Sequence, residues 1–185
     1  MPPEPVGAVF DAVEQAKYKA FKEARAGAAD YIEMKGEFSR YLEDVYSADP
    51  VPRAALKDEC DVLVVGAGFA GLLLWHKLRA AGFENVRFCE KGGDVGGTWY
   101  WNRYPGAQCD VESYIYLPLL EELGYMPKEK YSHAPEILEH SRAIGRHFDL
   151  YDGALFQTGV RELRWDDGEH RWLVSTDRGD VIRAR

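Results

Sequence analysis

The sequence is poor in cysteine, with three residues at widely separated positions, Cys60, Cys89 and Cys109. An odd number of cysteines without a C-x-x-C pair excludes a disulfide framework, so we expect reduced thiols. His133, His140 and His147 recur at a regular spacing, but no cysteine or carboxylate completes a ligand set around them. We therefore predict no metal site and interpret these three residues as surface histidines.

Positive net charge and long apolar runs are also missing. The formal net charge is -8 at pH 7, which argues against nucleic acid or an anionic membrane surface as a partner. No apolar run approaches the length of a membrane span, and the N-terminus lacks the basic start and apolar stretch of a signal peptide. We expect a cytoplasmic protein with neither kind of partner, while its oligomeric state stays open.

The spacing of apolar residues in the first part of the chain differs from that in the rest, and we predict a helical N-terminal extension over residues 1–56. Small and apolar residues recur at three- and four-residue intervals over residues 6–24, which indicates a helix that ends at Gly27. Asp30 followed by Glu33 resembles a capping box and predicts a second helix. We expect that helix to pack on its own domain through a stripe formed by Tyr31, Met34, Phe38, Tyr41, Leu42 and Val45.

The stretch from Asp61 to Asp110 carries the strongest pattern in the chain. Val62–Val65 is an apolar, β-branched run of the kind that forms a buried parallel strand. It leads directly into the motif Gly66-Ala-Gly68-Phe-Ala-Gly71, and residues 72–81 then predict a helix that ends at Gly82. A strand, a G-x-G-x-x-G turn and a helix in this order predict the first half of a dinucleotide-binding unit.

The second half is a short apolar run, Val86–Cys89, that ends at Glu90. In such units the first glycine permits the tight turn, the second lets the backbone approach a pyrophosphate, and the third lets the helix pack on the strand. A carboxylate at Glu90 accepts hydrogen bonds from ribose hydroxyls and repels a 2′-phosphate, which favours FAD or NAD over NADP. The predicted binding residues of this unit are Gly66, Gly68, Phe69, Ala70, Gly71, Glu90 and Lys91.

The next segment distinguishes FAD from NAD through a resemblance. Gly96-Gly97-Thr98-Trp99, Tyr104-Pro105-Gly106 and Asp110 resemble the motif of the Baeyer–Villiger monooxygenases. These flavoproteins use NADPH and dioxygen to convert ketones to esters or lactones through a C4a-peroxyflavin. The resemblance continues through Asp110-Val-Glu-Ser-Tyr-Ile-Tyr116 and Tyr131-x-x-x-Pro135-Glu-Ile, and it covers roughly residues 60–185. The helical extension is similar to that of the subgroup acting on cyclic ketones and steroids.

The resemblance implies FAD as the cofactor, together with NADPH, a ketone and O2 in the complete enzyme. It implies that Gly97, Thr98 and Trp99 line the path to the isoalloxazine ring and that Tyr116 contacts the flavin. Val160 would touch the adenine end through its backbone.

One catalytic residue is implied as well. Asp110 matches the aspartate that orients and activates an arginine near the flavin. That arginine, a second G-x-G-x-x-G for NADPH and the family's F-x-G-x-x-x-H-x-x-x-W signature do not occur in this sequence. We therefore expect the chain to be the front part of such an enzyme, with the NADPH site largely outside it, and to be inactive alone.

From residue 155 onward the hydrophobic period changes to two, which predicts strands over residues 155–158, 160–165, 171–176 and 181–185. Arg178-Gly179-Asp180 is interpreted as a hairpin turn and not as an adhesion motif. The whole pattern predicts an α/β fold, with a partial Rossmann-like FAD-binding domain of the glutathione-reductase type over residues 57–185. It includes an antiparallel meander. The resemblance implies that a further strand of the parallel sheet lies outside the chain, and the unpaired edge favours self-association.

Two alternatives stay open at this point. The chain can be the FAD-binding part of another flavin monooxygenase that oxidises nitrogen or sulfur, although the stretch from Tyr104 to Asp110 fits such enzymes less well. It can also be a non-catalytic nucleotide-binding fragment or an interaction module that works through the N-terminal helices.

Overall fold

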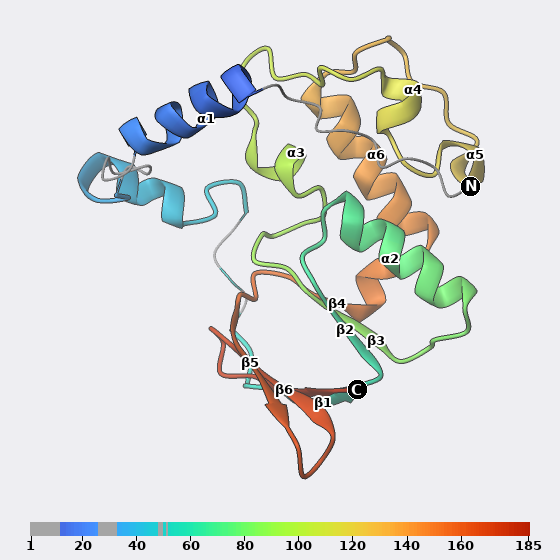
Figure 1. The fold of residues 1–185 in the computed structure, drawn as a ribbon. Coiled ribbons are helices and arrows are strands. Elements are labelled where there is room, and N and C mark those ends of the chain that lie inside the picture. Colours follow the sequence, from blue (N-terminus) through green and yellow to red (C-terminus); the bar gives the residue numbers. More distant parts are fainter. Residues whose placement is uncertain (1–11, 26–32, 48–49, 51) are drawn as a thin grey trace, which may run out of the picture. The chain divides into compact units, whose positions relative to one another are not determined.

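The computed structural model describes residues 12–25, 33–47, 50 and 52–185 (Figure 1). The chain divides into two compact units, Met1–Glu43 and Asp44–Arg185. The second unit thus begins ahead of the boundary predicted at residue 56. The reason is that the segment before residue 56 is already bonded to it: Asp44 accepts a hydrogen bond from the Gly93 backbone, and Arg53 pairs with Asp180.

The first unit contains the helix α1 (Ala12–Arg25) and the 3-10 helix η1 (Gly36–Leu42). The first predicted helix is confirmed over α1, while residues 6–11, Gly27, Asp30 and Tyr31 lie outside the described residues. The second predicted α-helix is wrong in type. Among the described residues of this unit its stripe forms no core, because η1 has no buried residue and Tyr41 is 60% exposed. The three-residue repeat instead stacks Phe38 on Tyr41 at 6.4 Å.

The second unit contains a parallel sheet in the order β2 (Val62–Val65), β3 (Val86–Cys89) and β4 (Ala154–Leu155). The helices α2 (Phe69–Ala80) and α6 (Ala134–His147) lie together on this sheet (Figure 1). Leu72, Trp75, Phe88 and Ile144 form the core between them. The α/β prediction is confirmed here, as are the end of α2 before Gly82, whose φ is +88°, and the start of α6 at Ala134.

An antiparallel meander forms the second sheet, from β5 (Val160–Asp166), β6 (Arg171–Thr176) and β7 (Val181–Ala184). This meander was predicted, but β1 (Lys57–Cys60), which pairs with β7 in parallel, was not. The prediction of a strand over residues 155–158 is mostly wrong. The strand ends at Leu155 because Gln157 turns at a φ of +49° and its N–H, like that of Thr158, bonds to the loop around Glu90.

Short helices connect the larger elements: α3 (Thr98–Trp101), α4 (Ser113–Tyr116), α5 (Leu120–Leu123) and η2 (Leu150–Gly153). The histidine prediction needs one correction. His133 and His147 are exposed, but His140 is buried, with its Nε2 bonded to the Pro118 carbonyl at 2.7 Å. It lies on the same face of α6 as Ile137 and Ile144. Burial lowers the pKa of His140 below its ordinary value.

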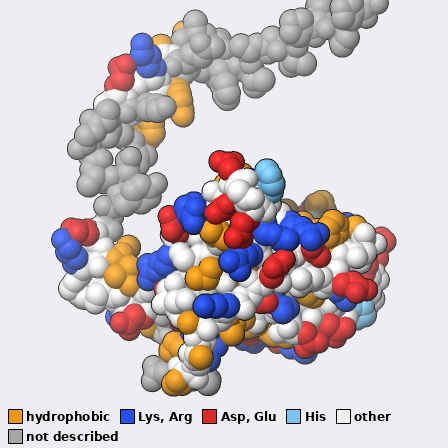
Figure 2. All heavy atoms as spheres, turned by 90° about the horizontal axis from the view of Figure 1, so that it is seen from below, with side chains coloured by type: hydrophobic (Ala, Val, Ile, Leu, Met, Phe, Trp, Pro, Cys, Tyr) orange, Lys and Arg blue, Asp and Glu red, His pale blue; other side chains and the backbone are white. Residues whose placement is uncertain are grey.

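All three cysteines are free and buried. Cys60 and Cys89 pack with Val174 and Ile182 between the sheets, and burial raises their pKa values to about 11 and about 12. Their thiols are therefore neutral and unreactive in the folded chain. Across the described ranges, no helix combines the length and the apolar character needed to cross a membrane. Basic and acidic side chains are interspersed over the face drawn in Figure 2.

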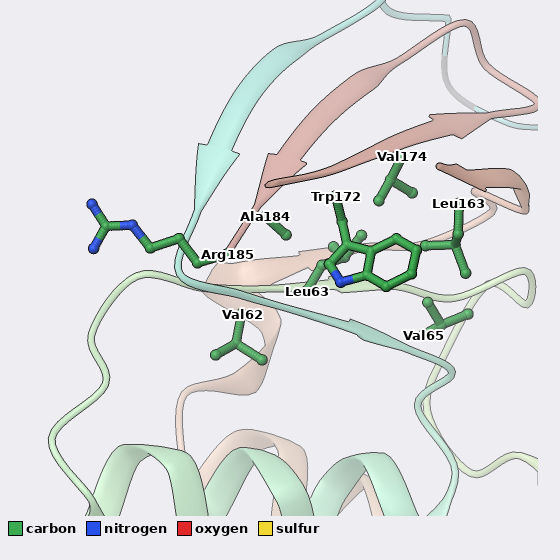
Figure 3. Close-up of a pocket in the computed structure, with 8 residues that line it drawn as sticks. All are labelled: Val62, Leu63, Val65, Leu163, Trp172, Val174, Ala184 and Arg185. Atoms are coloured by element: carbon green, nitrogen blue, oxygen red, sulfur yellow. The ribbon is translucent and has the colours of Figure 1, made fainter. Parts of the chain in front are cut away.

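The outer edge of β2 pairs with no other strand within the described part of the chain. An apolar pocket of about 290 Å³ lies beside it. Figure 3 shows Leu63 and Val65 of β2 near Leu163 and Trp172 of the second sheet at this pocket, while the side chain of Val62 points to the other side of β2, toward the helices. An edge strand with free backbone groups and apolar flanks is a template for pairing with another chain.

We expect this edge to cause concentration-dependent self-association. Val65→Lys places a charge at the pocket rim, where Val65 is 55% exposed, and should raise the association midpoint about ten-fold in sedimentation velocity. Ile115→Lys makes the same change on α4, outside the pocket, at a side chain that is 78% exposed. The edge is not the interface if both variants associate as the wild type does.

Candidate nucleotide-binding site

The first glycine motif forms the turn between β2 and α2. Gly66 has a φ of +93°, a conformation that glycine adopts without strain. A Cβ on Gly71 would lie 2.1 Å from the Gly66 carbonyl oxygen and 3.0 Å from Cε1 of Phe88. Only glycine therefore lets α2 begin this close to the strands. Gly68 caps α2 without a side-chain hydrogen bond to the first turn, which leaves the N–H groups and the positive helix end for a pyrophosphate.

Glu90 lies at the carboxyl end of β3, and its side chain joins the two sides of the site. The residue is 6% exposed. Its Oε2 accepts a hydrogen bond from the Ala67 N–H at 2.7 Å, and its Oε1 accepts one from the Gly92 N–H at 2.6 Å. A carboxylate has about four accepting positions. The two oxygens are thus fixed in place while retaining capacity for the hydroxyls of a ribose.

The second glycine motif lies directly on the first. The Gly96 N–H donates to the Ala67 carbonyl at 2.9 Å. Gly97 has a φ of +52°, and a Cβ there would lie 2.8 Å from the Cα of Gly68. Side chains would fill this space, so both motifs expose backbone at one place. Such a backbone-lined surface, with Glu90 at its edge, fits a dinucleotide with its pyrophosphate at the start of α2.

Aromatic side chains predicted for the flavin end come together beside these glycines. Trp99 is 8% exposed and donates its Nε1–H to the Tyr116 hydroxyl at 2.9 Å. The ring of Phe69, at the start of α2, lies 5.3 Å from that of Tyr116. The neighbouring Thr98 and Ala70 are exposed. The structure therefore joins residues from three separate sequence segments into one aromatic wall.

Other predicted residues lie apart from this cluster. Lys91 is exposed, with its Nζ 6.0 Å from the centre of the Trp101 ring, and makes no bond to Glu90 in the described chain. Asp110 is exposed, follows the buried Cys109, and has no hydrogen-bond partner among the described residues. Val160 opens β5, two residues after Thr158, whose N–H donates to the Glu90 carbonyl at 2.8 Å.

Asp94, which was not predicted from the sequence, holds the second glycine motif in place. The Asp94 carboxylate accepts hydrogen bonds from Arg142 Nε at 2.7 Å, from the Tyr151 hydroxyl at 2.8 Å and from the Val95 N–H at 2.8 Å. It ties the loop before Gly96 to α6 and η2. An acidic residue between two glycine pairs was visible in the sequence, but nothing there indicated its distant partners.

Comparison with known proteins agrees with this geometry. Residues 64–126 match the NAD(P)-binding Rossmann-like domain. The chain is 54% identical over 175 residues to neopentalenolactone D synthase of Streptomyces avermitilis, a match that covers 92% of this chain and 29% of that protein. It is 46% identical over 171 residues to a Baeyer–Villiger monooxygenase of Streptomyces coelicolor, with 91% and 28% covered. The chain corresponds to the N-terminal portion of the Baeyer–Villiger monooxygenases.

Solved structures of such monooxygenases share the fold. The polycyclic ketone monooxygenase of Thermothelomyces thermophila superimposes with a TM-score of 0.76 at 36% identity, covering 94% of this chain and 31% of that chain. A steroid monooxygenase bound to NADP gives a TM-score of 0.65 at 46% identity, with 68% and 24% covered. The resemblance read from the sequence is confirmed. The chain spans about 29% of the length of the curated Baeyer–Villiger relatives that it matches.

Proposed function

We propose that this chain provides the FAD-binding part of an NADPH- and O2-dependent monooxygenase that converts ketones to esters or lactones. The observation that carries the proposal is the contact between the two glycine motifs, at the Gly96–Ala67 hydrogen bond, with the Glu90 carboxylate beside it. A relative that is 47% identical over 166 residues is an FAD-binding monooxygenase of Hypomyces subiculosus, which supports FAD as the nucleotide. The meander after the parallel sheet supports a domain of the glutathione-reductase type.

The chain's own residues would bind and orient the cofactor. The first turn of α2, with Gly66 and Gly68, would hold the pyrophosphate, and Glu90 would accept hydrogen bonds from the adenosine ribose. Trp99 and Tyr116, in the aromatic wall, would keep water from the isoalloxazine ring. When bound, FAD supplies the redox chemistry that activates dioxygen. We place the NADPH site largely outside this chain and expect no ketone oxidation from the chain alone.

Asp110 is the one catalytic residue in the proposal. Its carboxylate is exposed and has no partner in the described chain, so it is available to a group from another part of the complete enzyme. A carboxylate beside a guanidinium stays ionised and fixes the guanidinium through charge-assisted hydrogen bonds. We propose that Asp110 orients an arginine near the flavin in this way.

The test is a titration of FAD into the purified chain, followed by flavin fluorescence, with circular dichroism as a check of folding. We expect saturable binding by the wild type and at least about 100-fold weaker binding by Glu90→Arg, because the cation replaces the ribose acceptor and loses the hydrogen bond from Ala67. Glu84→Arg, the same charge change at an exposed position before β3, should bind normally.

A milder variant separates binding from folding. Glu90→Gln keeps one accepting oxygen and the shape of the side chain, and it should weaken FAD binding about ten-fold in a folded chain. A folded wild type that binds NAD but not FAD would contradict the proposal.

A further inference from the structure

We infer that Asp44 is a positioning residue for the ribose end of the nucleotide site, acting through the loop that holds Glu90. The inference rests on the proposed function, because its target is the Glu90 carboxylate. Asp44 is the first residue of the second compact unit. Its Oδ2 accepts hydrogen bonds from the Gly93 N–H at 2.8 Å and from the Tyr100 hydroxyl at 2.5 Å. Asp44 is thus bonded to the loop after β3 and to α3 at once.

Two adjacent backbone N–H groups in this loop bind two different carboxylates. Gly92 donates to Oε1 of Glu90 at 2.6 Å, and Gly93 donates to Oδ2 of Asp44 at 2.8 Å. The two planar peptide groups that carry these N–H groups meet at the Cα of Gly92, so only φ and ψ of Gly92 separate them. Holding the Gly93 N–H on Asp44 therefore limits the conformations in which the Gly92 N–H can reach the Glu90 oxygen.

A second path of hydrogen bonds closes a ring around the same loop. The Ser47 hydroxyl donates to Asp44 at 3.0 Å and accepts from Nε2 of Gln157 at 2.7 Å. The Gln157 N–H in turn donates to the Gly92 carbonyl at 2.9 Å. The loop is held through its N–H groups on one side and its carbonyl on the other, and Asp44 takes part in both.

The segment around Asp44, residues 44–47, packs closely against the loop after β3. A Cβ on Gly93 would lie 2.4 Å from Cβ of Ser47, and a Cβ on Gly92 would lie 2.9 Å from Cε1 of Tyr100. The guanidinium of Arg103 lies 4.2 Å from the ring centre of Tyr46 and 4.6 Å from that of Tyr100. No side chain fits between the loop and these residues, so the contact depends on glycine on one side and on the Asp44 segment on the other.

Asp44 is ionised at neutral pH. Burial acts to raise its pKa, but the hydrogen bonds from Tyr100, Tyr46, Gly93 and Ser47 together outweigh this and lower it. Burial, followed by the bond to Asp44, also raises the pKa of Tyr100 to about 12, so its hydroxyl stays a donor. Charge-assisted hydrogen bonds of this kind are stronger than neutral ones, which suits a group that must hold a loop in one conformation.

The experiment compares Asp44→Asn, Glu90→Gln and the double variant by FAD and ADP titration. We expect Asp44→Asn to weaken both ligands about ten-fold, since ADP carries the same ribose and pyrophosphate. Because Asp44 acts through Glu90, the double variant should bind no more weakly than Glu90→Gln alone. Asp152→Asn, at an exposed position in η2, is the matched control and should bind as the wild type does.

Hydrogen exchange provides a readout that needs no ligand. In Asp44→Asn the amides of Gly92 and Gly93 should exchange at least about ten-fold faster than in the wild type. Tyr100→Phe removes one hydrogen bond to Asp44 but keeps the charge of Asp44 and the packing of the ring. It should also speed amide exchange and weaken FAD binding, and it replaces Asp44→Asn in the test if that variant does not fold. Normal FAD binding or unchanged Gly92 exchange in a folded Asp44→Asn chain overturns the role of Asp44 and leaves the proposed function standing. A folded wild type that binds neither FAD nor ADP overturns this role and the proposed function together.

Discussion

Gly97→Ala is expected to abolish measurable FAD binding while leaving most of the fold intact. The added methyl would lie 2.8 Å from the Cα of Gly68, backbone against backbone, at a residue whose φ is +52°. Neither glycine has a flexible side chain that can move away. The second motif must therefore move off the first, which breaks the surface proposed to hold the pyrophosphate and weakens the Gly96–Ala67 hydrogen bond.

A matched variant separates this clash from simple backbone strain. Gly82 also has a left-handed φ, +88°, but a Cβ there meets no atom within 4 Å. Gly82→Ala should cost about 1 kcal/mol of stability at the end of α2 and bind FAD as the wild type does. Fluorescence titrations of both variants, together with their urea unfolding curves, distinguish the clash between the two motifs from general backbone strain. Equal affinities would show that the contact of the two motifs does not form the binding surface.

The dinucleotide unit could be predicted because its information is local. An apolar strand, three glycines at fixed offsets and an acidic residue lie within one short segment, and each has a physical role that limits the residue type. The end of α2 at Gly82 and the start of α6 at Ala134 were predictable for the same reason, since helix ends depend on one or two residues.

The remaining features depend on partners far away in the sequence. Lys57–Cys60 is mostly polar and gives no strand pattern, yet it forms β1 because β7 offers it a parallel edge. His140 seemed suited to the surface of α6, but the Pro118 carbonyl satisfies it in a buried position. Asp44 and Asp94 hold the loops of the site through side chains that no local pattern connects to them. The glycines of the site and Glu90 could be predicted from the local sequence, whereas Asp44 and Asp94, whose partners are distant, could not.

Asp180→Asn is expected to destabilise the second unit by about 3–5 kcal/mol, the usual cost of breaking a buried ion pair. Asp180 is fully buried and forms a two-pronged pair with Arg53, from Nη1 to Oδ1 at 2.5 Å and from Nη2 to Oδ2 at 2.7 Å. It also accepts from the Leu56 N–H and from the Thr176 hydroxyl, both at 2.8 Å. The amide cannot accept all four bonds, and it leaves the Arg53 charge unpaired. This geometry also confirms Arg178–Asp180 as a turn whose carboxylate is committed to the fold.

The pH dependence gives the same residue an independent test. The hydrogen bond from Arg53 holds the pKa of Asp180 well below its ordinary value, against the effect of burial. A lowered folded-state pKa contributes stability that is complete above the unfolded-state pKa of about 3.9 and is lost as the pH falls below it. Urea midpoints of the wild type should therefore fall more steeply than those of Asp180→Asn between about pH 5 and pH 3.

Asp167→Asn, at the exposed turn between β5 and β6, is the control. It should keep the wild-type slope, with a free energy of unfolding within about 0.5 kcal/mol of the wild-type value. Parallel slopes for Asp180→Asn and the wild type would mean that the pair with Arg53 does not stabilise the junction of β1 and β7.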